Sequence, residues 1–88
     1  MTLEALRQAT HRAVGANQTV KAIQRGQALV VFVAKDADPR VTESVVRAAQ
    51  QKGLPLVQEH TKRELGRACG IAVEAAAAAI LKGPALES

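Results

Sequence analysis

The segment 17–25 carries amide and cationic side chains at a spacing that would place them on one face of a helix. At about 100° per residue, five polar residues fall within an arc of about 120°, opposite Val20 and Ile23. They are Asn17, Gln18, Lys21, Gln24 and Arg25. Amide side chains donate and accept on base edges, lysine donates to guanine acceptors, and a helix start attracts phosphate. The pattern suits nucleic acid, but on these residues alone a solvated polar face with Asn17 as N-cap is the favoured explanation.

The residues that could support catalysis or bind a metal do not form a recognisable site. His11 and His60 fall in separate elements, with no cluster of further ligands at metal-binding spacing. Asp36 and Asp38 precede a predicted helix, where turn formation and capping account for them. Cys69 is better explained as a small buried apolar residue than as a nucleophile. The glycines match no phosphate-binding loop, so the sequence predicts no enzyme, no metal site and no cofactor.

Composition restricts the class of protein further. With 88 residues, the chain is predicted to be one domain covering 1–88, because two cores would each bury too little surface. The single cysteine cannot form an internal disulfide, which suits a reducing compartment such as the cytoplasm. No leader pattern opens the chain, and the apolar run 75–81 is too short to span a bilayer. A soluble cytoplasmic protein is therefore expected, and its size favours a monomer.

The formal net charge of +4 is unevenly distributed along the chain. Residues 1–35 carry five cationic side chains against one carboxylate, whereas residues 36–88 carry seven of each sign. A basic balance of this kind is compatible with a polyanionic partner, without establishing one.

The first third of the sequence predicts two helices and a strand. A helix is expected over 3–13, with Thr2 as its N-cap, and a second helix from Asn17 to a stop at Gly26. The apolar run 28–34 is rich in β-branched residues, which is typical of a central strand covered on both faces.

The remainder predicts an alternation of helices and strands. Asp38 and Pro39 start a helix that stops at Gly53. Its buried stripe is predicted to comprise Val41, Val45, Ala48 and Ala49. A short strand follows at 54–58, then a helix that opens with a capping box at Thr61 and Glu64, and a last strand at 75–81. These elements predict a three-layer α/β/α domain around a small sheet.

Three sequence blocks in register span nearly the whole chain: GANQTVKA at 15–22, AKDADP at 34–39 and ELGRACG at 64–70. Together they resemble the kink-turn RNA-binding ribosomal-protein family. That family includes an archaeal large-subunit protein, eukaryotic ribosomal relatives and a core protein of small nucleolar ribonucleoproteins. In length and in these motifs the chain is most similar to the short bacterial YbxF-type branch.

The resemblance implies a three-layer α/β/α sandwich with a four-stranded mixed sheet, and recognition of kink-turns. These are sharply bent RNA internal loops beside tandem sheared G·A pairs. The positions that match the family's guanine-reading residues are Gly15, Asn17, Gln18 and Lys21, and the loop that covers an extruded nucleotide matches Ile71, Ala72 and Val73. Gln24 and Arg25 are added from the helical arc as residues expected to approach the RNA backbone.

One residue departs from the wider family pattern, which commonly has glutamate where this chain has Gln18. Glutamine donates as well as accepts hydrogen bonds, so its base contacts need not be those of the glutamate. The sequence does not name the RNA: a ribosomal kink-turn and a riboswitch would both present the same motif. An alternative is a protein-interaction module on the same fold without specific RNA recognition.

Overall fold

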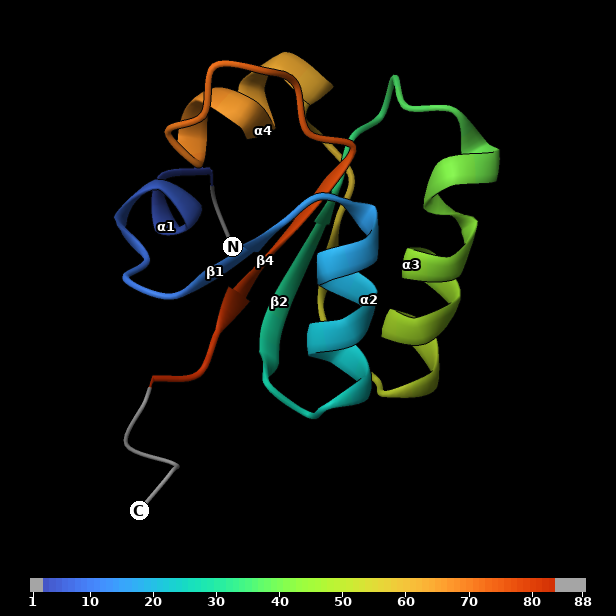
Figure 1. The fold of residues 1–88 in the computed structure, drawn as a ribbon. Coiled ribbons are helices and arrows are strands. Elements are labelled where there is room, and N and C mark those ends of the chain that lie inside the picture. Colours follow the sequence, from blue (N-terminus) through green and yellow to red (C-terminus); the bar gives the residue numbers. More distant parts are fainter. Residues whose placement is uncertain (1–2, 84–88) are drawn as a thin grey trace.

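The computed structural model describes residues 3–83 and contains an alternation of helices and strands (Figure 1). In chain order these are α1 (Leu3–Gln8), β1 (Arg12–Val14), α2 (Ala16–Gln24), β2 (Ala28–Val33), α3 (Pro39–Gln51), β3 (Leu56–Val57), α4 (Lys62–Ala68) and β4 (Ala77–Leu81). The strands expected at 28–34, 54–58 and 75–81 are present, each shorter than predicted.

The four strands form one mixed sheet in the order β1-β4-β2-β3. Strand β4 lies between β1 and β2 and is antiparallel to both, whereas β2 and β3 are parallel. The four-stranded mixed sheet implied by the family resemblance is therefore confirmed.

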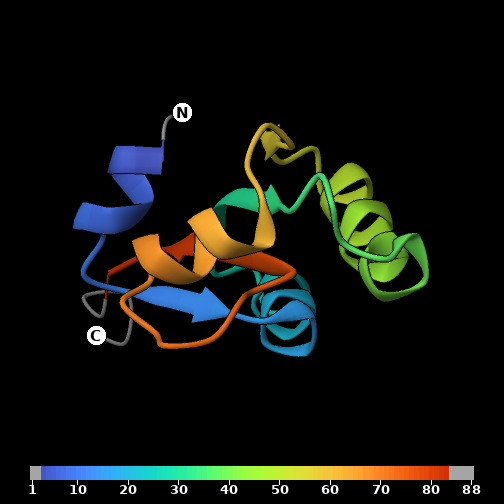
Figure 2. The same cartoon turned by 90° about the horizontal axis from the view of Figure 1, so that it is seen from above.

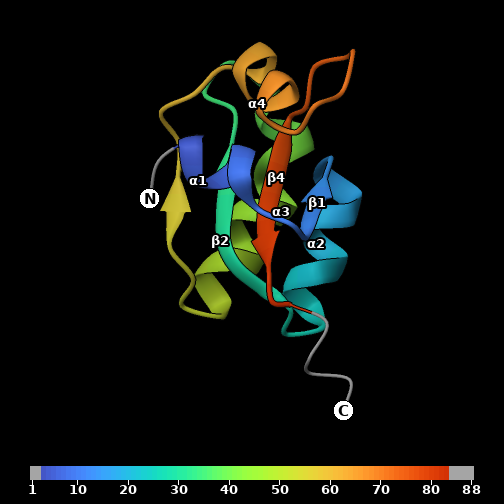
Figure 3. The same ribbon diagram turned by 90° about the vertical axis from the view of Figure 1, so that its left-hand side faces the viewer.

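Helices cover both faces of this sheet, because β2 alternates its side chains between two cores. Val31 and Val33 pack in one cluster with residues of α2 and α3, including Ile23 and Val45. The intervening Phe32 packs in a second cluster, formed with residues of α1 and α4 such as Leu6 and Leu65. In Figure 3, α1 lies in front of the strands and α3 behind them. The predicted three-layer α/β/α architecture is confirmed.

The predicted helix over 3–13 is wrong in its second half. Helix α1 ends at Gln8, and Arg12–Val14 is an edge strand in which Arg12 lies opposite Ile80 and Val14 opposite Ala78. The Arg12 side chain donates from Nη1 to the carbonyl oxygens of Leu6 (3.3 Å) and Arg7 (3.1 Å) in the last turn of α1. Pairing with β4 therefore overrides the local helical pattern. The expected N-cap, Thr2, lies outside the described residues.

Helices α3 and α4 begin where the sequence predicts. The Asp38 carboxylate accepts the Arg40 N–H at 2.9 Å, and Thr61 and Glu64 form the predicted capping box. The predicted buried stripe of α3 is wrong at one position: Val41 is 48% exposed and Thr42 is buried instead. With the helix starting at Pro39, Thr42 shares a face with Val45 and Ala49, whereas Val41 turns to solvent.

The alanine run forms the centre of the sheet. Ala77, Ala78 and Ala79 are all fully buried, and they alternate between the two cores. Alanine is a weak strand former, but its small side chain lets helices on both faces approach the sheet closely. Packing therefore determines the residue type here.

Replacing Ala78 by valine tests this account. We expect Ala78→Val to lower the free energy of unfolding by about 1–3 kcal/mol, because two extra methyl groups overfill a closed core, despite valine's higher strand propensity. Urea denaturation measures the change. The same substitution at the exposed Ala72 is the control and should leave stability nearly unchanged; a more stable Ala78→Val variant would contradict the packing argument.

Candidate nucleic-acid interface

A single residue connects β1 to α2. Val14 ends the strand, Ala16 begins the helix, and Gly15 between them has φ 97° and ψ 154°. That backbone conformation is open essentially to glycine alone. The Gly15 N–H donates to the carbonyl oxygen of Ala77 in β4 (2.8 Å), and its own carbonyl accepts the Thr19 N–H (2.9 Å). The start of α2 is therefore fixed to the end of the sheet.

This turn corrects the expectation that Asn17 caps the helix. Gly15 is the N-cap, and it has no side chain to occupy the first N–H groups of α2. The starts of α3 and α4, by contrast, are filled by the side chains of Asp38 and Thr61. The first turn of α2 also contains no acidic residue. Its N–H groups and positive dipole end are therefore available to an acceptor from outside the protein.

Three polar side chains of α2 are also available to a partner from outside the protein. Asn17, Gln18 and Lys21 are exposed, and within residues 3–83 their side chains make no hydrogen bond or ion pair. On the opposite face of α2, Ala22 and Ile23 are buried in the core. A firmly packed helix thus presents two amides and an ammonium group that folding does not use.

Two of the predicted binding residues lie apart from this group. Gln24 and Arg25 are exposed at the other end of α2. Eight residues separate Asn17 from Arg25, which corresponds to about 12 Å along the helix axis. Gln24 and Arg25 therefore do not adjoin the helix start; they continue the exposed polar face beyond Lys21, which already lies in the last turn of α2.

The loop after α4 carries the predicted apolar residues and lies directly against that helix. Ile71 packs partly into the core, whereas Ala72 is exposed and Val73 is 70% exposed. A Cβ atom added at Gly66 would overlap the carbonyl oxygen of Val73. Glycine at this position lets the loop rest on α4, which holds Val73 outward.

The same loop returns to the sheet beside the start of α2 (Figure 2). The Ala76 carbonyl accepts the Ala34 N–H (2.9 Å), and the next carbonyl, that of Ala77, accepts the Gly15 N–H. The structure therefore brings the helix start and the loop of Ile71, Ala72 and Val73 to one end of the molecule.

Asp36 supports this loop in a way that sequence reasoning missed. Its carboxylate accepts the Lys62 N–H at 2.8 Å, although the two residues are 26 positions apart. The Lys62 carbonyl in turn accepts the Ala75 N–H (3.1 Å). The sequence predicted only a local turn for Asp36, because nothing in it marks two such distant residues as partners.

Cys69 and His60, which were considered as possible catalytic or metal-binding residues, have positions that packing explains. Cys69 is buried, and desolvation raises the pKa of its thiol, which disfavours the reactive thiolate. His60 lies beside Phe32, with ring centroids 6.5 Å apart. In the part of the chain that the structure describes, no three His, Cys, Asp or Glu side chains gather as metal ligands, and no helix is long and apolar enough to cross a membrane.

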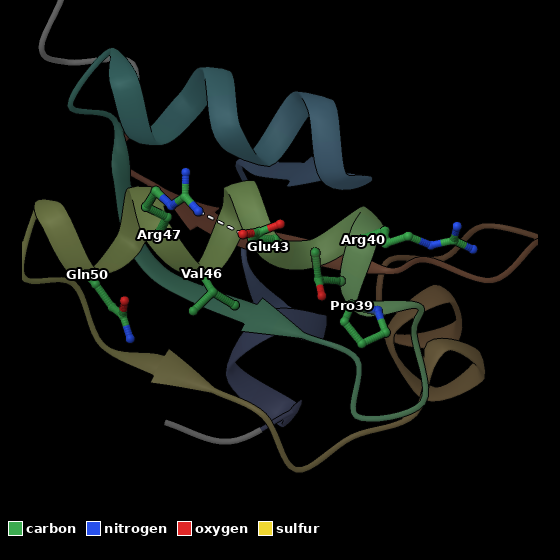
Figure 4. A pocket seen from close by; sticks show the side chains of 7 residues that line it. Pro39, Arg40, Glu43, Val46, Arg47 and Gln50 are labelled. Carbon is green, nitrogen blue, oxygen red and sulfur yellow. Dashed lines mark hydrogen bonds and ion pairs between the residues drawn. The ribbon is translucent and has the colours of Figure 1, made fainter.

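A hollow beside α3 differs in character from the helix start (Figure 4). Its lining includes Arg40 and Arg47, but Arg40 pairs with Asp38 at 2.9 Å and Arg47 with Glu43 at 2.7 Å. A phosphate group would have to compete with these carboxylates. The hollow contains none of the predicted RNA-binding residues and offers no free cationic group of its own.

Fold and surface together define a layered α/β protein that presents an uncapped, amide-bearing helix start next to an exposed apolar loop. The chain belongs to the ribosomal protein L7Ae/L30e/S12e/Gadd45 family, whose model matches residues 2–87. The resemblance noted in the sequence is thus confirmed. The family is non-catalytic, which confirms that the chain is not an enzyme.

Its relatives include bacterial proteins of similar length. An RNA-binding protein of Bacillus pumilus is 44% identical over 81 residues, covering 92% of this chain and 99% of the relative. The RNA-binding protein YbxF of Geobacillus stearothermophilus is 40% identical over 82 residues, covering 93% and 100%. Among solved structures, a 15.5kD RNA binding protein of Giardia lamblia superposes with a TM-score of 0.81 at 36% identity, covering 97% of this chain and 74% of that one.

Substituting Gly66 tests the seating of the loop. We expect Gly66→Ala to displace the loop, to shift backbone amide NMR signals of residues 71–75 most strongly, and to cost about 1–3 kcal/mol of unfolding free energy. Gly83 has open space where an added methyl group would lie, so Gly83→Ala is the matched control. Unchanged signals for 71–75 in Gly66→Ala would show that the loop does not depend on this contact.

Proposed function

We propose that the chain acts as one non-catalytic RNA-binding unit, residues 1–88, which recognises kink-turns and stabilises the bent form of the RNA. The observation that carries the proposal is the start of α2, where uncapped N–H groups lie near amide and ammonium side chains that have no partner within residues 3–83. Membership of the family and the RNA-binding names of its relatives support the same function.

The chemistry of the helix start suits the edges of sheared G·A pairs. Lys21 would donate to guanine acceptors in the major groove, and Asn17 and Gln18 would each donate and accept on base edges. Gly15 lacks a side chain, so the RNA can approach the backbone of the turn. Gln18 carries no charge, so it does not repel neighbouring phosphates as a glutamate would.

The loop is proposed to cover the nucleotide that the bend extrudes. Ile71, Ala72 and Val73 offer an apolar surface, and the Val73 side chain is 70% exposed. An unstacked base loses its neighbours in the RNA, and contact with apolar side chains restores part of that burial. Gln24 and Arg25, one helix length away, would meet the backbone of the flanking stem.

Stabilising a bent RNA requires different affinities for its bent and extended forms. The two sets of contacts provide this difference, because only a kinked RNA can present G·A edges to α2 and an extruded base to the loop together. The Gly15 N–H is hydrogen-bonded to β4, and the loop is hydrogen-bonded to α4 through the N–H groups of Ile71 and Ala75, so little ordering is needed on binding. Binding as a monomer in the cytoplasm, to ribosomal RNA or a riboswitch, is consistent with this proposal.

A titration separates specific recognition from general charge attraction. The labelled RNAs are a kink-turn duplex and a duplex whose G·A pairs are replaced by Watson–Crick pairs, each at two salt concentrations. We expect one-to-one binding and at least about tenfold preference for the kink-turn, which is roughly 1.4 kcal/mol. Equal and steeply salt-dependent binding to both RNAs would contradict the proposal and favour the protein-interaction alternative.

Point substitutions then test the residues. We expect Asn17→Ala and Lys21→Ala each to weaken kink-turn binding by about 1–3 kcal/mol, with unchanged thermal stability, because both side chains are exposed and make no hydrogen bond or ion pair within residues 3–83. Lys52→Ala is the control: Lys52 is also exposed and without an ion pair in the described region, but it lies at the far end of α3. Full affinity in both test variants would refute the site.

A further inference from the structure

A second cationic surface lies where the loop meets α4. A hollow there is bounded by α4 and by the loop that follows it. Its lining residues are Arg63, Arg67, Ile71, Ala72, Val73 and Glu74. The same loop that is proposed to cover the extruded nucleotide therefore forms one wall, and two arginines form the other.

The two arginines are without acidic partners in residues 3–83. Both are exposed, and neither takes part in an ion pair or a side-chain hydrogen bond there. The nearby carboxylates are engaged elsewhere: that of Glu64 accepts the Thr61 N–H at 2.9 Å, and that of Glu74 lies 3.7 Å from the Lys62 ammonium group. This differs from Arg40 and Arg47 on α3, which are both paired.

The spacing of Arg63 and Arg67 is unfavourable for the free protein. Like charges four residues apart on a helix face each other and destabilise it slightly. An anionic ligand between or across them would remove this repulsion. The guanidinium group is also the side chain best suited to phosphate, because its donors match two phosphate oxygens at once.

We propose that Arg63 and Arg67 bind backbone phosphates of the RNA strand as it continues past the nucleotide covered by Ile71, Ala72 and Val73. The inference rests on the proposed function and extends its footprint over α4. A nucleotide joins an apolar base to an anionic phosphate, and this hollow joins an apolar wall to a cationic one. About 6 Å of helix rise separates the arginines, so they address neighbouring phosphates rather than one.

The test measures the salt dependence of kink-turn binding. Each phosphate contact contributes about 0.7–0.9 to the slope of log K against log salt concentration. We expect Arg63→Gln/Arg67→Gln to reduce the slope by about 1.4–1.8, with the preference for the kink-turn over the Watson–Crick duplex retained. Arg63→Lys/Arg67→Lys keeps the charges and should retain most of the slope.

The matched control removes two charges elsewhere. Lys52 and Lys82 are exposed, have no ion pair in the described part of the chain, and together line a hollow with Gly26 and Leu54. Lys52→Gln/Lys82→Gln therefore changes the net charge equally. These lysines directly follow α3 and β4, whose C-terminal ends lie at the end of the molecule opposite α4 (Figure 1). We expect the slope of this variant to match that of the unsubstituted protein. Circular dichroism melting of each variant checks that the fold is intact.

The outcomes separate the two proposals. In one outcome the unsubstituted protein prefers the kink-turn, but Arg63→Gln/Arg67→Gln has the same salt slope as Lys52→Gln/Lys82→Gln. The α4 contact is then refuted, and the proposed function stands. If the unsubstituted protein shows no preference, the proposed function fails, and the inference built on it fails as well.

Discussion

The hydrogen bond from the Gly15 N–H to the Ala77 carbonyl is the contact on which the candidate site depends. It ties the one-residue connection between β1 and α2 to the central strand β4. A connection this short excludes a conventional side-chain cap, because the N-cap position must adopt a conformation that only glycine tolerates. The absence of a side-chain cap at the start of α2 is thus a direct consequence of the single-residue connection from β1.

Strand β4 connects the helix start to the apolar loop, which directly precedes this strand in the chain. Its alanines are fully buried between two helical layers, so the strand has little freedom to shift. The residue before it, Ala76, is bonded to Ala34 at the end of β2, and the loop beyond is seated on Gly66 and bonded to Lys62. The helix start is therefore held by β4, and the apolar loop, which leads into β4, is held by α4. Two surfaces fixed in this way can bind a bent ligand with little loss of conformational freedom.

Sequence reasoning succeeded where the determinants are local. Asp38 with Pro39 and Thr61 with Glu64 mark helix starts through contacts within three residues, and the β-branched run marks β2. It failed where distant pairing decides. A three-residue strand at Arg12–Val14 exists because β4 lies beside it, and Asn17 seemed a cap because its residue type favours that role while Gly15 gives no side-chain signal. The exposed polar arc on α2 was predicted correctly, since helical periodicity alone determines it.

Counting charges along the sequence also missed one group of cationic side chains that have no acidic partner among the described residues. By that count the positive excess lies entirely in residues 1–35, and the remainder is balanced. In the folded chain, however, what matters is which cations have carboxylates beside them. Arg40 and Arg47 do, whereas Arg63 and Arg67 do not within residues 3–83, although all four belong to the balanced segment. A paired guanidinium has little remaining field at short range, while two bare ones a helical turn apart reinforce each other. A balanced composition can therefore conceal a pair of arginines that have no acidic partner within residues 3–83, and here that pair lines a hollow together with the loop of Ile71, Ala72 and Val73.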